Sequence, residues 1–397
     1  MSSKNDTTNR KKPQSAATLR RNIHTHLIDL GFTKDGHGYF VEGELSKQKI
    51  RDLHAVHRHD IVAQHRDFVE AEWSDLSHWF STGKTLNPEA IDPELVEVKA
   101  GSQESRLFRL ASLLWSIPVS QGFGRRLRFL VRDRQNGCLI GMFALGDPVF
   151  NLTARDSWIG WTHQDRSDRL VHVMDAYVAG AVPPYSHVIS GKLVAALMAS
   201  KEVKAAYERK YLGKRAIISE AENRARLVLL TTTSALGRSS MYNRLALPGG
   251  VKFHHLGATR GFGHFHLSGR IFESLRTHLE DVGHPYASGH RFGMGPNWKI
   301  RVIRAALESI GFEGGGSILK HTIPREVYAV PLATNWKEVL LGEHKNTRSC
   351  VQPANEIASY CLQRWILPRA KRDKRYKRFA RRRIIDALLN GGPGPEW

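Results

Sequence analysis

The sequence is poor in cysteine and has no long apolar run. Its 397 residues include three cysteines, Cys138, Cys350 and Cys361, and no Cys-x-x-Cys pair. A disulfide framework or a cysteine-paired zinc site is therefore not expected. No stretch reaches the roughly 18 to 20 uninterrupted apolar residues that cross a bilayer, and the amino-terminal residues contain no apolar signal core. These absences predict a cytoplasmic protein that neither enters nor crosses a membrane.

Acidic residues are also scarce relative to basic ones. There are 38 Asp and Glu against 59 Lys and Arg, so the formal net charge is +21. The excess is +5 over residues 1–22, +8 over residues 364–397 and +8 over the chain between them. A positive field of this size attracts polyanions, so DNA or RNA is the expected partner.

The length favours two or three packed units, and the alternation of predicted strands and helices favours a mixed α/β fold over a helical bundle. The expected regions follow one another along the chain. They are a disordered basic arm at 1–14, a helical region at 15–115, an α/β core at 116–250, a glycine- and histidine-rich α/β continuation at 251–363, and a basic helical segment at 364–397.

Local patterns predict individual elements. Ser15 is placed to cap a helix with Leu19, Ile23 and Leu27 at helical spacing. Beyond Pro118 the predicted strands are 127–132, 139–145, 157–161, 228–233, 251–256, 262–267 and 326–332. The predicted helices there are 170–179, 190–211, 268–282 and 356–365.

The carboxy-terminal segment is the densest basic tract. Eleven of the twenty residues from 364 to 383 are Lys or Arg, interleaved with Trp365, Tyr376 and Phe379. Cations bind phosphates and aromatic rings stack on unpaired bases, so the three rings are candidate stacking platforms. The predicted phosphate contacts are Arg369, Lys371, Arg372, Lys374, Arg375, Lys377, Arg378, Arg381, Arg382 and Arg383. The alternative is a solvated or disordered tail without a specific role.

A second candidate surface is a predicted helix after the glycine-rich loop 289–295. Lys299, Arg301 and Arg304 lie in this helix, and Arg301 and Arg304 share a face because they are three residues apart. The helix start and two of its cations could bind one phosphate together. An ordinary amphipathic surface helix is the alternative explanation.

No residue pattern identifies a reaction. His264 and His266 would point to one side of a strand, but neither a nearby cysteine nor a His-Glu-x-x-His helix completes a metal site. A loose acidic series that includes Asp175 lacks a recognised nuclease spacing, and residues 257–263 lack the Gly-Lys-Ser/Thr of an ATP-binding loop. We therefore expect neither a metal nor a cofactor, and the sequence leaves open whether the protein is an enzyme.

Several tracts in a fixed order resemble the DruA family, a component of type I Druantia anti-phage defence systems in bacteria. The tracts are Lys49-Ile-Arg-Asp-Leu-His54, Trp158-Ile-Gly-Trp161, Ser239-Ser-Met-Tyr-Asn-Arg-Leu245, Gly257-Ala-Thr-Arg-Gly-Phe-Gly263, Gly293-Met-Gly-Pro-Asn-Trp-Lys-Ile-Arg301, Pro324-Arg-Glu-Val327 and Arg364-Trp-Ile-Leu-Pro-Arg369. The resemblance implies membership of a multi-subunit defence system with a large helicase-like partner. It implies no established reaction and no catalytic residue.

The same family is distantly similar to acyltransferases of the GCN5-related fold. In that fold a hairpin precedes a splayed strand pair, and a helix start with the pattern Arg/Gln-x-x-Gly-x-Gly/Ala binds coenzyme A. Residues 185–193 correspond to this start, with Gly191 in place but Val188 and Leu193 departing from the pattern. The expected function is a nucleic-acid-binding component that acts on phage-derived DNA or RNA. The alternatives are an acyl-transfer enzyme acting on nucleic acid or protein, and an adaptor that docks acidic partner subunits.

Overall fold

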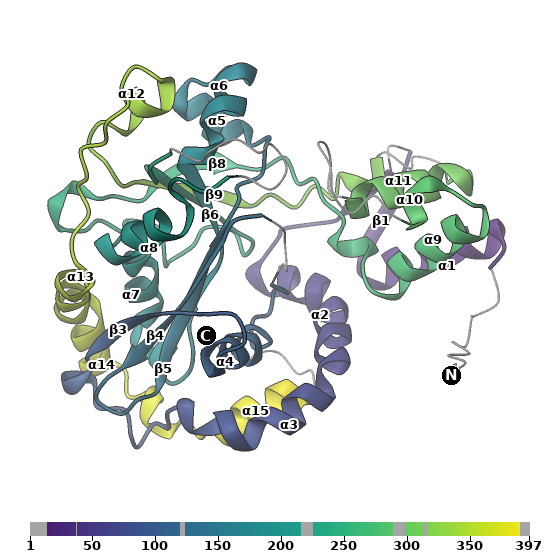
Figure 1. Cartoon of the computed structure of the whole chain (residues 1–397). Coiled ribbons are helices and arrows are strands. Elements are labelled where there is room, and N and C mark those ends of the chain that lie inside the picture. Colours follow the sequence, from purple (N-terminus) through teal and green to yellow (C-terminus); the bar gives the residue numbers. More distant parts are fainter. Residues whose placement is uncertain are drawn as a thin grey trace, which may run out of the picture. The chain divides into compact units, whose positions relative to one another are not determined.

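The computed structural model describes residues 14–36, 38–119, 124–215, 225–288, 298–312 and 317–389 (Figure 1). The chain forms two compact units. The first unit consists of Met1–Leu45, Asp52–His57 and Arg260–Ile323, and the second of Ser46–Arg51, Arg58–Thr259 and Pro324–Trp397. Each unit joins segments that are distant in sequence, whereas the regions predicted from the sequence follow one another along the chain. The predicted mixed α/β class is confirmed.

The second unit is built on a seven-stranded sheet with the strand order β3-β4-β5-β6-β7-β9-β8. All neighbouring strands are antiparallel except β6 and β7, which are parallel. The strands are β3 (Pro93–Glu97), β4 (Arg126–Asp133), β5 (Leu139–Gly146), β6 (Val173–Ala181), β7 (Leu229–Ser234), β8 (His254–Ala258) and β9 (Glu326–Pro331). The predicted hairpin of β4 and β5 is therefore present, as are predicted strands near β7, β8 and β9.

The parallel pair separates early. β6 and β7 pair from Val173 opposite Leu229 to Ala176 opposite Thr232, and β6 then continues to Ala181 beside β5 alone. A hairpin followed by a splayed strand pair is the arrangement that the GCN5-related resemblance implies. The separation leaves polar side chains of β6 and β7 next to the point where the sheet opens.

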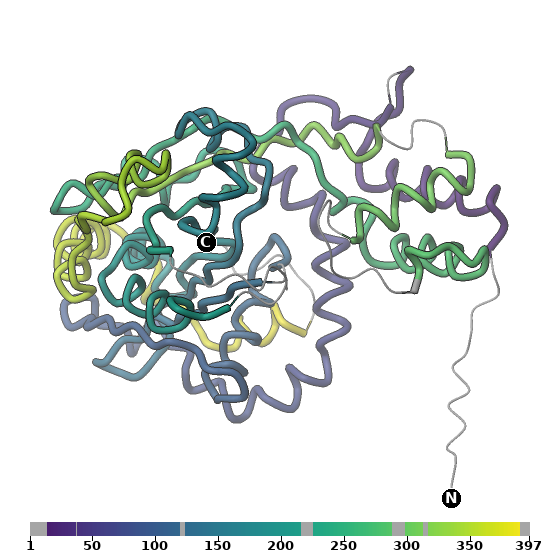
Figure 2. The backbone as a smooth tube through the Cα atoms, turned by 45° about the horizontal axis from the view of Figure 1, so that its top comes forward, coloured from purple at the N-terminus to yellow at the C-terminus, as the bar shows by residue number. Residues whose placement is uncertain are grey.

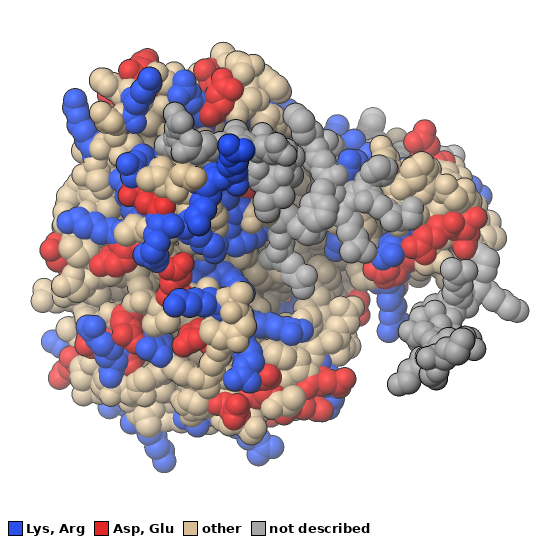
Figure 3. Space-filling model, viewed as in Figure 1, with Lys and Arg blue, Asp and Glu red and all other residues tan. Residues whose placement is uncertain are grey.

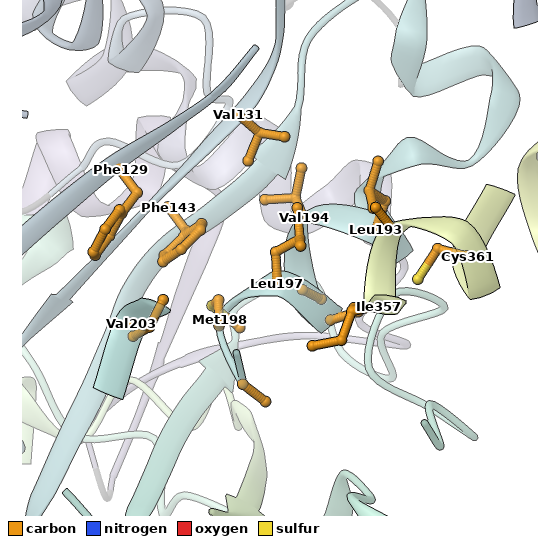
Figure 4. Packing of buried hydrophobic residues seen from close by; sticks show 14 of the residues in the cluster. Phe129, Val131, Phe143, Leu193, Val194, Leu197, Met198, Val203, Ile357 and Cys361 are labelled. Atoms are coloured by element: carbon orange, nitrogen blue, oxygen red, sulfur yellow. The ribbon is translucent and has the colours of Figure 1, made fainter. Parts of the chain in front are cut away.

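Helices cover both faces of this sheet, and β5 is buried along its whole length as a consequence. One face packs against α7 (Ser190–Leu197), α8 (Lys201–Tyr211), α13 (Ala354–Cys361) and α14 (Leu367–Arg372). Figure 4 shows side chains of the hairpin, α7 and α13 meeting in this layer: Phe129, Phe143, Val194, Leu197, Ile357 and Cys361.

The other face carries two separate apolar clusters. One lies under α3 (Arg66–Leu76), α4 (Gln103–Ser112) and α15 (Arg382–Leu389), beside the end of α2 (Lys47–Gln64). The second lies under α5 (Thr153–Ile159) and α12 (Trp336–Leu341), next to α6 (His163–Arg169). Sheet residues on this face that lie between the two clusters belong to neither of them.

The first unit brings the amino-terminal segment beside residues that follow 260. It contains α1 (Ala16–Asp29), β1 (Phe32–Asp35), β2 (Gly38–Val41), α9 (Arg270–Asp281), α10 (Pro285–Ser288) and α11 (Trp298–Ser309). Figure 2 shows the purple amino-terminal segment next to the green segment that contains α9 and α11. Ser15 caps α1, and Leu19, Ile23 and Leu27 are buried, as predicted. Residues 1–13 of the predicted arm lie outside the described residues.

Several local predictions are wrong. Residues 157–161 were expected to form a strand but lie at the end of helix α5, where the Trp158 ring stacks on Trp336 at 4.2 Å between centroids. Residues 170–179 were expected to be helical but mostly form β6, a sheet-interior strand whose nearly continuous apolar run has no clear alternation. The predicted long helix 190–211 is interrupted, because Ser200 caps a new helix, α8.

Candidate nucleic-acid interface

The basic carboxy-terminal segment is folded onto the second unit. We call residues 364–389 the C-terminal strap. It consists of α14, the short 3-10 helix Arg375–Arg378 and α15. The Gly83 backbone N–H donates to the Phe379 carbonyl at 2.8 Å, and the Arg381 Nε–H donates to the Phe80 carbonyl at 2.7 Å. The strap is therefore an integral part of the fold, and the tail alternative does not hold for its described residues.

The aromatic residues of the strap are its anchors. Tyr376 and Phe379 expose only 3% and 4% of their surface, so in this fold they are core residues and cannot stack on bases as predicted. Trp365 is half-buried, and its ring lies 5.5 Å from that of Tyr360 and 5.4 Å from the Lys192 ammonium. The apolar surface of an aromatic ring is most stabilising when buried, which explains why these rings face inward.

The cations of the strap lie on the opposite side from these anchors. Arg369 and Arg381 are half-buried, while the other predicted phosphate contacts are exposed: Lys371, Arg372, Lys374, Arg375, Lys377, Arg378, Arg382 and Arg383. The structure therefore brings the predicted basic residues of the strap together on one short folded segment.

One carboxylate offsets part of this charge. Asp373 forms ion pairs with Arg369 at 2.9 Å and with Arg375 at 2.7 Å. Hydrogen bonds from Arg375, together with the charges of Arg375 and Arg369, hold the pKa of the Asp373 carboxyl well below its usual range. Among the predicted phosphate contacts of the described strap, five exposed cations form neither an ion pair nor a side-chain hydrogen bond to a carbonyl: Lys371, Lys374, Lys377, Arg378 and Arg383. These five are available for phosphates.

Positive charge is not restricted to the strap. On the face drawn in Figure 3, Lys and Arg side chains are spread over the second unit with Asp and Glu between them. This distribution agrees with the net charge of +21 for the whole chain. A positive field of this kind favours the approach of polyanions in general.

The first unit carries a different type of basic surface on α11. Each predicted cation of this helix lies over an aromatic ring: Lys299 Nζ is 5.1 Å from the centroid of Phe272, Arg301 Cζ 5.7 Å from that of Tyr286, and Arg304 Cζ 5.8 Å from that of Phe262. The Phe262 and Tyr286 rings are 47% and 36% exposed, unlike the buried Phe272. We call Phe262, Tyr286, Arg301 and Arg304 the α11 surface.

This surface was only half predicted. The sequence pattern predicts the cations but not Phe262 and Tyr286 as platforms, because it places Phe262 within a strand. The glycine-rich loop 289–295, which was expected to supply backbone amides, lies outside the described residues. An exposed aromatic ring beside an arginine is a platform for an unpaired base.

The helix start that corresponds to a coenzyme A cradle is covered by the protein itself. Ser190 is fully buried, and the Met241 Sδ lies 3.3 Å from the position that a Cβ on Gly191 would occupy. The Lys192 ammonium donates to the carbonyl of Asn243 at 3.2 Å. In the described structure, segment 241–243 therefore occupies the space that a pyrophosphate would need, which agrees with the departures from the cradle pattern.

The histidines near residue 265 form part of a core. Residues 265–267 form a 3-10 helix where a strand was expected, so His264 and His266 do not share a strand face. His266 is buried, its Nε2–H donates to the Ile318 carbonyl at 2.7 Å, and burial with neighbouring histidines lowers its pKa to about 3. No group of three or more His, Cys, Asp or Glu in the described ranges could hold a metal ion. None of the described helices is both long and apolar enough to cross a membrane.

Comparison with known proteins identifies the family. The family model described as "Druantia protein DruA" matches residues 44–342. A curated Druantia protein DruA from Escherichia coli (strain UMEA 4076-1) is 42% identical over 375 residues, which cover 94% of this chain and 92% of that protein. No solved structure matches the chain. The chain therefore belongs to the DruA family, a component of Druantia anti-phage defence systems.

Proposed function

We propose that this protein is the nucleic-acid-binding subunit of its Druantia system and that it presents phage-derived DNA or RNA to a helicase-like partner. The observation that supports this most directly is the construction of the C-terminal strap. Most of its apolar and aromatic residues are buried or half-buried, while five exposed cations without ion pairs project from the outer side. Solubility alone does not need such a density of ordered positive charge.

The two surfaces favour different parts of a nucleic acid. The strap offers cations without exposed rings, which suits the phosphate backbone of either strand form. The α11 surface adds exposed rings beside Arg301 and Arg304, which suits unpaired bases. We therefore propose that the strap supplies affinity and that the α11 surface supplies a preference for single strands.

The strap makes a quantitative prediction. Neutralising five phosphates gives a slope of log affinity against log salt of about −4.5 on duplex DNA and about −3.5 on single strands. A variant in which Lys371, Lys374, Lys377, Arg378 and Arg383 are replaced by Gln should lose most of this slope. Fluorescence anisotropy with labelled oligonucleotides over a salt series measures it.

A matched control separates the strap from total charge. Replacing five exposed cations elsewhere, Lys34, Lys47, Lys201, Lys337 and Lys345, removes the same charge from the chain. If the strap variant and this control lose equal affinity and slope, the strap is no specific interface. If neither the native chain nor the control binds DNA or RNA at low salt, the proposed function is wrong.

Acidic partner subunits are the main competitor for the same basic surface. Co-purification with other Druantia subunits after nuclease treatment distinguishes the two. Loss of the complex on nuclease treatment supports nucleic acid as the ligand, and survival of the complex together with absent DNA binding supports an adaptor.

A further inference from the structure

A row of polar positions crosses the sheet of the second unit at the point where β6 and β7 begin to separate. The strand registers place Arg126 opposite Gly146, Gly146 opposite Asp175, and Asp175 opposite Thr231. Because alternate residues of a strand face opposite sides, Asp175 and Thr231 share the face of Val173 and Leu229. This face carries the two apolar clusters, and the row lies between them. We call Arg126, Asp175, Thr231 and the nearby Arg325 the Asp175 site.

Asp175 is held in place but not neutralised by a cation. The Thr231 hydroxyl donates to Asp175 Oδ1 at 2.7 Å. The fully buried Arg155 is a charge that acts on Asp175, but it pairs with a different carboxylate. Its Nε–H donates to the neighbouring Asp156 at 2.8 Å. Asp175 keeps some solvent-accessible surface. Within the described residues, the Asp175 carboxyl therefore has a hydroxyl as its hydrogen-bond donor and no cation within ion-pair distance.

The position of the Arg126 guanidinium depends on the absence of a side chain at Gly146. This guanidinium occupies the space over Gly146 where a side chain would otherwise lie, with Cζ 3.0 Å from the position of a Cβ. The same guanidinium stacks on the Tyr177 ring at 4.5 Å from its centroid. The Nε–H is buried and has no acceptor in the described structure. A buried donor without an acceptor costs free energy, and an anion beside the guanidinium would offset this cost through its charge.

Arg325 adds a second cation without an acidic partner. Its backbone is fixed by mutual hydrogen bonds with Thr259. Burial lowers the pKa of its guanidinium, and the charge of Asp175 opposes that effect. In the described part of the chain, neither Arg126 nor Arg325 has a carboxylate within ion-pair distance. Two incompletely neutralised guanidinium groups therefore lie near one carboxyl.

The carboxyl itself can change charge near neutral pH. Burial raises the pKa of Asp175 to about 6, against the hydrogen bond from Thr231 and the charges of Arg155, Arg126 and Arg325. The Tyr242 hydroxyl is the remaining titratable group that interacts with it, and burial raises the pKa of Tyr242 to about 12. Once Asp175 is protonated, the site is purely cationic and its carboxyl can donate a hydrogen bond to an anion.

We propose that the Asp175 site binds a phosphate monoester, with Arg126 and Arg325 as the cationic contacts and Asp175 as a proton-dependent contact. Planar guanidinium groups match the oxygen geometry of phosphate, and a protonated Asp175 carboxyl, held by the Thr231 hydroxyl at Oδ1, adds one further donor. The site lies on the sheet face and uses no residue of the strap, so this inference does not rest on the proposed function.

Isothermal titration calorimetry of the full chain with inorganic phosphate and with sulfate tests the site. Arg126→Gln and Arg325→Gln should each weaken binding by at least about tenfold, because each removes a charge-assisted hydrogen bond. Arg276→Gln is the control, since Arg276 lies on α9 and pairs with Glu280 there. Thermal melting shows whether each variant is folded, and Arg325→Lys, which keeps the charge, should retain part of the affinity. Equal affinity in all of these variants would overturn the proposal.

The pH dependence is specific to Asp175. Sulfate does not titrate between pH 5 and 7, so a change in its affinity reports on the protein. Binding of an anion favours the protonated carboxyl, and lowering the pH from 7 to 5 should therefore strengthen sulfate binding by about tenfold. Asp175→Asn carries no charge at either pH and should bind tightly throughout. An unchanged pH profile in Asp175→Asn would contradict the assignment of Asp175.

The source of the phosphate is decided by competition. A nucleoside 5′-monophosphate, a 5′-phosphorylated oligonucleotide and the same oligonucleotide with a 5′-hydroxyl are compared in native and Arg126→Gln protein. Preference for the phosphorylated over the hydroxyl oligonucleotide, lost in Arg126→Gln, assigns the site to nucleic-acid ends. Preference for the mononucleotide assigns it to a free nucleotide. Binding of none of these ligands, nor of phosphate or sulfate, would show that the site is not used for anions.

Discussion

Gly83 controls the docking of the C-terminal strap, and its replacement by alanine makes the clearest structural prediction. A Cβ at this position would meet the carbonyl oxygens of Tyr376 and Lys377 and would lie 2.5 Å from the Lys377 carbonyl carbon. These are backbone atoms, so no side-chain rotation can relieve the overlap. The strap backbone would have to move away, and the hydrogen bond from Gly83 to Phe379 would be lost.

The expected cost follows from what the strap buries. Removing a buried aromatic side chain costs about 3–5 kcal/mol, and loss of a backbone hydrogen bond about 1 kcal/mol. A partial displacement of Tyr376 and Phe379 should therefore lower the free energy of unfolding by about 2–4 kcal/mol. Denaturant unfolding measures this, and hydrogen exchange should show lost protection over residues 367–389.

The matched control is Gly36→Ala, because a Cβ at Gly36 meets no atom within 4 Å and its backbone is not in the left-handed region. This variant should change stability by less than about 0.5 kcal/mol. Unchanged stability and unchanged exchange in Gly83→Ala would refute the assignment of Gly83 as the docking point of the strap.

Three further predictions address the binding surface, the core and pH. Phe262→Ala and Tyr286→Ala should each weaken single-stranded DNA binding by about 1–3 kcal/mol and leave duplex binding nearly unchanged, as anisotropy would show. Tyr185→Phe removes the hydroxyl that donates to the fully buried Asp133 carboxylate at 2.8 Å, and should lower the free energy of unfolding by about 1–3 kcal/mol in denaturant titrations. The lowered pKa of His266 means that the folded state binds its proton less readily than the unfolded state. Its stability contribution is therefore present above about pH 6.5 and is lost by up to about 1.4 kcal/mol per pH unit as the pH falls from there toward 3. Thermal melting at pH 7.5 and at pH 5 checks this, and His266→Phe should reduce the difference in melting temperature between the two pH values.

Elements with local signals could be predicted from the sequence, and elements set by distant partners could not. The β4–β5 hairpin is marked by a turn-forming run between two apolar stretches, and α9 is an amphipathic helix with a clear period. β6 has neither signal. It lies in the sheet interior beside β7, which is more than fifty residues away in sequence, so its apolar residues follow no strand alternation.

The same limit applies to the candidate sites. The density of cations in the strap is visible in the sequence, but the orientation of Tyr376 depends on Gly83, almost three hundred residues earlier. Asp175 could be noted only as one member of an acidic series. Its position beside Arg126 and Thr231 follows from the registers of four strands, which no local pattern encodes.

The burial of the strap also decides how its role can be tested. A chain truncated after Gln363 loses the cations but also loses the strap residues that are buried on both faces of the sheet: Ile366, Ala370, Tyr376, Phe379, Ile384 and Leu388. Each large apolar side chain contributes about 2–5 kcal/mol, whereas a whole domain is stable by about 5–15 kcal/mol.

The truncated chain should therefore melt without a cooperative transition and bind a dye for exposed apolar surface. Any loss of DNA binding by it would report on folding and not on phosphate contacts. The five-residue Gln variant avoids this problem, because its substituted side chains are exposed. If the truncated chain instead melted cooperatively at the temperature of the full-length protein, the strap would be a separable appendage, and its ordered display of cations would no longer support the proposed function.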